Sequence, residues 1–178
     1  MAWAKENRQE LPRDYRGLLA YPLDERRAIY THLSATEKAA FWSGKIASYL
    51  EEHPQLSAVE RQAVAEAQAF LTPEIYTATA APDSPARARV VEQLNAMATR
   101  VTLGLGEAAA QELLYGLGPE AKAKSGAKTS TSLGPSCDCA FLLDCKSPAN
   151  CWDLPCLVKP SGCGIGGNFP CDGVCNFE

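Results

Sequence analysis

The chain has 178 residues, of which 46% are hydrophobic, a composition that favours one packed domain with a small appendage over general disorder. Its 17 basic and 21 acidic side chains leave a net charge of −4. Nucleic acid is therefore not an expected partner, because phosphate binding requires a concentrated basic face. No apolar run approaches the roughly 20 residues of a transmembrane helix.

Helical signals begin near Asp24, and the first expected helix covers residues 24–33. Ser34, followed three residues later by Glu37, forms a capping box, which predicts that a second helix starts there and continues to His53 before Pro54. The apolar residues of this second helix recur with helical spacing and predict one buried face: Trp42, Ile46, Tyr49 and Leu50. Phe41 and Phe70 are expected in the same helical core.

Three further helices are expected before residue 118. Ser57 and Glu60 repeat the capping box, and the expected stripe that follows is Val59, Ala63, Ala67, Phe70 and Leu71, ended by the turn signal Thr72-Pro73-Glu74. After a linker rich in Pro and Ala, Ser84 and Pro85 predict the start of a helix that ends near Gly104 and buries Val90, Leu94, Met97 and Val101. The last helix covers about 107–115. Residues 1–118, which we call the leader, are therefore predicted to be all-α with about five helices.

The composition changes after Leu117. Residues 119–136 consist mainly of Ala, Lys, Ser, Thr and Gly, with Leu133 as the only large apolar side chain. Such a segment cannot bury enough surface to offset its chain entropy. It is predicted to be a flexible linker that a protease can reach.

All eight cysteines lie in the final segment, residues 137–178, which we call the tail. An even number of cysteines in a short segment is typical of disulfide frameworks, and we expect four bridges among Cys137, Cys139, Cys145, Cys151, Cys156, Cys163, Cys171 and Cys175. A segment this small requires such bridges to fold. Their connectivity does not follow from sequence, since 105 pairings are possible.

Metal binding and reactive thiols are the alternative interpretations of these cysteines. Zinc sites use paired C-x2–4-C knuckles, often with histidine. Here Cys171 and Cys175 form a lone knuckle, Cys137 and Cys139 are too close for one, and the tail has no histidine. Disulfides are therefore favoured, and neither a metal nor a cofactor is expected.

Turn signals fill the gaps between the cysteines, so the tail is expected to be mostly irregular. Gly164, Gly166 and Gly167 are interpreted as turn glycines, and Asp172-Gly173 as a candidate hairpin turn. Trp152, together with Phe141, Leu142 and Leu143, is a candidate contact patch for a target; a small core under the disulfides is the alternative. Five acidic and two basic side chains give the tail a charge of −3, which opposes simple cationic attraction to anionic lipid.

No enzyme motif accompanies these features. His32 and His53, the only two histidines, lie near expected helix ends and are interpreted as capping or surface residues. No nucleophile elbow, P-loop or metalloprotease helix is present, so no catalytic residue is expected. The first ten residues lack the apolar run of a secretory signal. The chain is expected to be made in the cytoplasm and its tail to be secreted by a route that the sequence does not show.

Two parts of the sequence match the motifs of a known family. In the tail the matching features are Cys137-Asp-Cys139, the eight cysteines, Ser161-Gly162-Cys163-Gly164 and Cys175-Asn176-Phe177. In the leader they are Leu11-Pro12, Tyr15, Arg26-Arg27-Ala28-Ile29-Tyr30, Leu33-Ser34, Lys38, Trp42, Leu56-Ser57 and Leu71-Thr72-Pro73-Glu74. In these features the chain resembles the fulvocin C-related bacteriocin family.

The resemblance implies a ribosomally made precursor, in which the leader meets the export or processing machinery and the tail acts on a target bacterial cell or protein. A second hypothesis is a secreted binding or inhibitor module carried on a helical adaptor. A third is an intracellular metal or redox protein.

Overall fold

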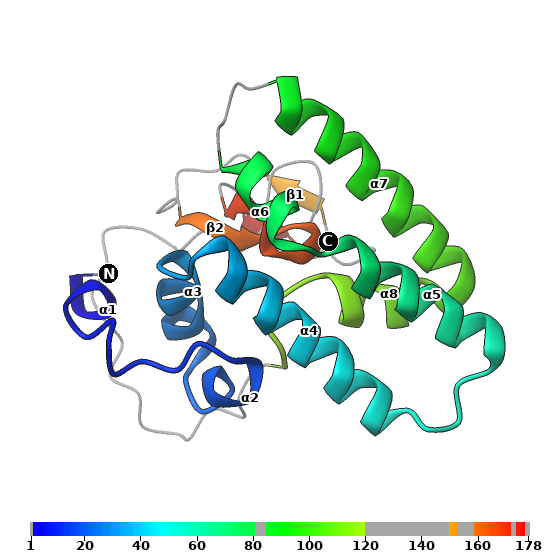
Figure 1. The fold of residues 1–178 in the computed structure, drawn as a ribbon, viewed down its shortest axis with the longest axis horizontal. Helices are drawn as coiled ribbons and strands as arrows, with labels where there is room; N and C mark the ends of the chain where they lie inside the picture. Colours follow the sequence, from blue (N-terminus) through cyan, green and yellow to red (C-terminus); the bar gives the residue numbers. More distant parts are fainter. Residues whose placement is uncertain (1, 81–84, 120–149, 153–158, 172–173, 177–178) are drawn as a thin grey trace. The chain divides into compact units, whose positions relative to one another are not determined.

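The computed structural model describes residues 2–80, 85–119, 150–152, 159–171 and 174–176. The chain divides into two compact units, which are described separately. Residues 1–11, 18–32 and 116–178 form the tail-containing unit, and residues 12–17 and 33–115 form the helical unit. The described part of the leader is all-α, as predicted, and the described part of the tail contains short strands and a 3-10 turn (Figure 1).

The helical unit contains α4 (Ala35–Glu52), α5 (Ala58–Phe70), α6 (Pro73–Thr79), α7 (Pro85–Leu105) and α8 (Glu107–Leu114). Both predicted capping boxes are confirmed at the starts of α4 and α5. At the first, the Glu37 backbone N–H donates to the Ser34 hydroxyl at 3.3 Å, and the Ser34 N–H donates to the Glu37 carboxylate at 2.7 Å. The hydrogen bond from the Ser34 backbone lowers the pKa of the Glu37 carboxyl.

The predicted apolar stripes supply much of the core of this unit. Fully or nearly fully buried side chains come from α4, α5, α7 and α8: Phe41, Trp42, Ile46, Tyr49, Ala63, Val64, Ala67, Leu94, Met97, Val101, Leu113 and Leu114. Leu50, Phe70 and Val90 are half-buried. The prediction for Val59 was wrong, because this side chain is 69% exposed and Val64 takes the core position.

Two details of the helical unit depart from the sequence interpretation. Thr72-Pro73-Glu74 does not only end a helix; it also starts α6, since proline is well tolerated at the first helical position. The short α2 (Tyr15–Leu18), whose residues 15–17 belong to this unit, was not predicted; the Tyr15 ring packs edge-on against Phe41 at 5.4 Å between centroids. Both histidines lie at helix C-caps, as expected: His32 after α3 and His53 after α4.

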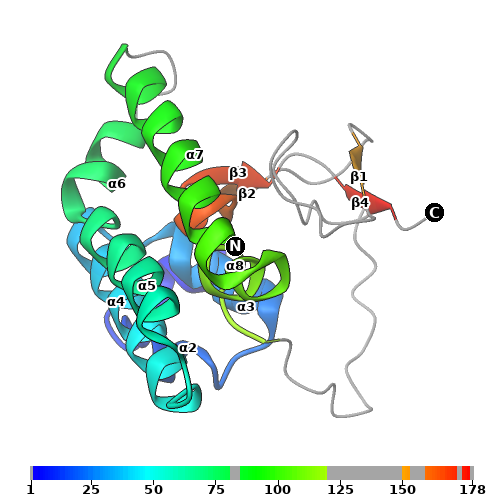
Figure 2. The ribbon, with the colours of Figure 1, turned by 90° about the vertical axis from the view of Figure 1, so that its right-hand side faces the viewer.

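The described residues of the tail-containing unit form two leader helices and four short strands. Its helices are α1 (Ala2–Glu6), which the sequence did not predict, and α3 (Leu23–Thr31). In the tail, β1 (Asn150–Trp152) pairs with β4 (Val174–Asn176), and β2 (Lys159–Cys163) pairs with β3 (Phe169–Cys171), both antiparallel (Figure 2).

The strand pairing corrects the expected hairpin. The two strands on either side of Asp172-Gly173, β3 and β4, pair with β2 and β1 rather than with each other, and the turn itself lies outside the described residues. The turn that does join two paired strands is Gly164–Asn168, which contains the 3-10 turn η1 (Ile165–Gly167). Within the described ranges, no helix combines the length and the apolar content needed to cross a bilayer.

Lys45 is an unusual member of the helical core. Its side chain is 4% exposed, and its Nζ donates to the backbone carbonyl of Tyr115 at 2.9 Å and lies 4.4 Å from the centroid of the Trp42 ring. Burial lowers the pKa of the Lys45 amine to about 7, against an opposing effect of Glu112. Above about pH 7 the folded unit therefore favours the neutral amine.

We expect the stability of the chain to rise with pH because of Lys45. Above about pH 7 the unfolded chain still binds a proton at this amine and the folded chain releases it, so the free energy of unfolding rises by up to about 1.4 kcal/mol per pH unit until the unfolded amine titrates. The variant Lys45→Met should lose this slope. Denaturant unfolding at pH 7, 8 and 9 measures it, and equal slopes in both proteins would contradict the prediction.

Candidate functional site: the cysteine loop on helix α3

A disulfide closes the described part of the tail into a small loop. Cys163 at the end of β2 is bonded to Cys171 at the end of β3, with a sequence separation of 8 and a Cα–Cα distance of 5.2 Å. We call residues 163–171 the cysteine loop. Cross-linking over so short a loop stabilises the folded state by roughly 2.5 kcal/mol, mainly by restricting the unfolded chain.

Glycines determine the shape of the cysteine loop. Gly164, Gly166 and Gly167 have positive φ angles of +69°, +65° and +61°. A left-handed backbone costs other residues about 1–2 kcal/mol. Gly164, with ψ of −174°, lies in a region that is essentially restricted to glycine. Gly164 also lies directly against the Phe169 ring, so a Cβ atom there would overlap it. The interpretation of these residues as turn glycines is confirmed.

The cysteine loop contacts helix α3 through Tyr30. The Tyr30 hydroxyl donates to the backbone carbonyl of Gly166 at 3.0 Å, and the Tyr30 side chain is completely buried. A Cβ atom at Gly167 would lie 3.0 Å from this hydroxyl and 3.1 Å from two ring carbons. The loop backbone therefore approaches the tyrosine as closely as a glycine allows.

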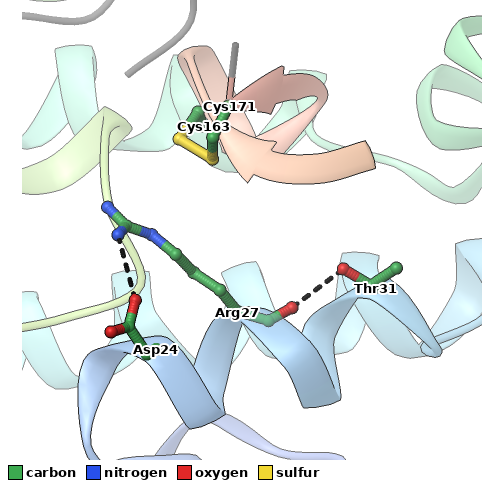
Figure 3. Close-up of a disulfide and its surroundings, with 5 residues drawn as sticks. All are labelled: Asp24, Arg27, Thr31, Cys163 and Cys171. Carbon is green, nitrogen blue, oxygen red and sulfur yellow. Dashed lines mark hydrogen bonds and ion pairs between the residues drawn. A yellow bond between two sulfur atoms is a disulfide. The ribbon is translucent and has the colours of Figure 1, made fainter. Parts of the chain in front are cut away.

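Most of the cysteine loop is buried in the tail-containing unit. The five consecutive residues 163–167 are buried, as are Phe169 and Cys171, and β2 packs against α3. Figure 3 shows the Arg27 side chain on the side of α3 where the bridge lies. The Arg27 guanidinium is 3.8 Å from the Asp24 carboxylate, and the Thr31 hydroxyl donates to the Arg27 backbone carbonyl at 2.9 Å. The loop thus meets a surface of α3 that carries both aromatic and cationic groups.

Arg26 connects the same helix to the end of the leader. Its guanidinium is 1% exposed and donates to the backbone carbonyls of Leu19 at 3.2 Å, Tyr21 at 2.7 Å, Leu117 at 3.3 Å and Pro119 at 2.8 Å. A planar fork of donors suits such a set of carbonyls, which a lysine could not satisfy together. The chain therefore contacts α3 where the leader ends and the predicted linker begins.

The predicted site residues fall into three groups. Cys163 and Cys171 form the described bridge. Cys151 in β1 lies opposite Cys175 in β4, and Trp152 lies opposite Val174. The others lie outside the described residues: Cys137, Cys139, Cys145, Cys156, Phe141, Leu142 and Leu143.

Sequence reasoning did not find the residues of α3 that contact the tail. Arg26, Arg27 and Tyr30 carried the family resemblance, but nothing in their helical spacing indicates a partner 136 residues away, the separation of Tyr30 and Gly166. The one available signal was the glycine run 164–167. Closely spaced glycines permit a close backbone approach, although they do not say to what.

Within the part of the chain that the structure describes, no group of three or more His, Cys, Asp or Glu side chains is placed to bind a metal ion. The groups that the site presents are the Tyr30 hydroxyl, backbone carbonyls, apolar side chains and the Arg27 guanidinium. No protein-family model, curated protein or solved structure matches the chain.

Replacing Gly167 should destabilise the tail-containing unit more than replacing Gly116, a glycine of the same unit. Both have left-handed backbones, with φ of +61° and +69°, but only Gly167 faces a side chain, whereas nothing lies within 4 Å of a Cβ at Gly116. Gly116→Ala should lower the free energy of unfolding by about 1–2 kcal/mol, because of backbone strain alone. Gly167→Ala should lower it by about 1 kcal/mol more, because the new methyl group also presses on the Tyr30 ring.

Denaturant unfolding of the two oxidised variants measures this difference in the free energy of unfolding. Equal losses of unfolding free energy in the two variants would contradict the prediction, because the Tyr30 ring would then move aside at no cost in stability.

Proposed function

We propose that the chain is the precursor of a ribosomally made antibacterial peptide, of the fulvocin C-related kind, in which the tail is the active part. It is not an enzyme in this proposal. The observation that carries the proposal is the Cys163–Cys171 bridge, which closes a glycine-shaped loop inside a segment that contains all eight cysteines. The sequence resemblance gives this loop its proposed role.

The division of cysteines supports separate roles for the two parts. The leader contains no thiol, so its helices can form in a reducing cytosol without any oxidation step. The tail needs an oxidising environment, because each bridge forms from two thiols with loss of two electrons and two protons to an external oxidant. Secretion followed by oxidation would then yield the active peptide.

The released tail should inhibit growth of neighbouring bacteria. We expect the oxidised peptide 137–178 to produce a zone of inhibition and the same peptide, reduced and alkylated, to produce none, because so small a segment lacks a core that folds without bridges. Mass spectrometry before and after reduction verifies the oxidised state, with a gain of eight hydrogens expected for four bridges. A fully oxidised tail that inhibits no strain of a broad panel would contradict the proposal.

A secreted binding or inhibitor module on a helical adaptor is the second candidate. It is favoured by the grouping of residues 18–32 of the leader with the tail in one compact unit, which suits parts that act together. In that case the chain would remain intact after export. In the precursor proposal, the leader is removed.

The culture medium of the producing cells should distinguish the two functions. The precursor proposal predicts a secreted mass corresponding to the tail, whereas the adaptor predicts the intact 19.1 kDa chain. Whole-protein mass spectrometry of the medium, without reduction, gives the answer. A secreted intact chain that is stable over the whole growth curve would favour the adaptor.

A further inference from the structure

We infer that helix α3 of the leader is a non-covalent binding site for the cysteine loop, so that cutting the linker leaves the tail bound to the leader. The biological role of this binding rests on the proposed precursor function, but the binding itself does not require antibacterial activity. Its central contact is the hydrogen bond of 3.0 Å from the Tyr30 hydroxyl to the Gly166 carbonyl.

A single cut in the linker leaves no covalent connection between the two parts. All eight cysteines lie at or after residue 137, so no disulfide can join the tail to residues 1–136. Arg26 binds the carbonyls of Leu117 and of Pro119, the first residue of the predicted linker, so α3 holds the end of the leader whether or not the linker is cut further on. Whatever retains the tail must therefore be the packing of the tail-containing unit.

The cysteine loop is well suited to stay bound. Once formed, the disulfide restricts the conformations of the loop together with three glycines of positive φ, so the oxidised loop loses little conformational entropy when it binds the helix. Its buried apolar side chains include Ile165, 1% exposed, and Phe169, 5% exposed. Release of the loop would expose the apolar ring of Tyr30, which is completely buried and lies against Gly167, and this opposes dissociation.

The leader would then be the first binding partner of the tail and would cover the loop. Cleavage of the linker would be necessary for release but not sufficient. A second event, such as degradation or unfolding of the leader, would be needed before the loop reaches a target. This deepens the proposed function by giving α3 the role of an inhibitory segment.

The test uses the full oxidised chain with a site-specific protease sequence inserted between Ser125 and Gly126. After complete cutting, verified by denaturing mass spectrometry, native mass spectrometry and size-exclusion chromatography at about 10 µM should show the two fragments together. This corresponds to a dissociation constant below about 1 µM. Fragments that separate at this concentration would overturn the inference.

The variant Tyr30→Phe tests whether the named contact is responsible. It removes only the hydroxyl that donates to Gly166 and should weaken the fragment complex about three- to tenfold. Tyr76→Phe is the matched control, because Tyr76 is also a buried tyrosine, 5% exposed, and belongs to the helical unit. Equal affinities of the two variants would overturn the assignment to α3.

This test is independent of the antibacterial assay. A tail that stays bound after cutting but kills no bacteria when isolated would support the inference and contradict the proposed function. A tail that kills but separates at once would do the reverse.

Discussion

The contact between Tyr30 and the glycine turn is the constraint on which the tail-containing unit depends. Arg26 and Tyr30 are four residues apart and so lie one above the other on the same face of α3. The Arg26 guanidinium donates to the carbonyls of Leu117 and Pro119. The Tyr30 hydroxyl donates to the Gly166 carbonyl, and the Tyr30 ring lies against Gly167. One short helix therefore organises both the end of the leader and the described core of the tail.

The other features of the loop follow from that approach. A tyrosine hydroxyl buried without an acceptor would cost about 1–3 kcal/mol, so the Gly166 carbonyl must be presented to it. Presenting it requires the left-handed turn of Gly164, Gly166 and Gly167, and the disulfide closes the loop that the turn creates. The glycines and the disulfide thus support the same arrangement, in which the backbone of the cysteine loop, rather than a side chain, contacts helix α3.

Most of the leader could be predicted from sequence because its signals are local. The capping boxes at Ser34 and Ser57 involve residues three positions apart, and the stripe through Trp42, Ile46 and Tyr49 needs only helical periodicity. The error at Val59 arose at the edge of such a stripe. The strand pairing and the Tyr30 contact were beyond local reasoning, since they depend on which distant segments meet.

The same difference between local and distant contacts suggests an order of folding. Helices form in about a microsecond or less, whereas disulfides form over seconds to hours. The thiol-free α3 would therefore be folded before the Cys163–Cys171 bridge exists. When residues 163–171 adopt their turn against Tyr30, the two cysteines come close together. The Tyr30 ring leaves no room for a side chain at position 167, so the turn fits there only with glycine. We therefore expect α3 to favour this pairing over the alternatives open to eight cysteines, so that the helix that covers the loop also directs its oxidation.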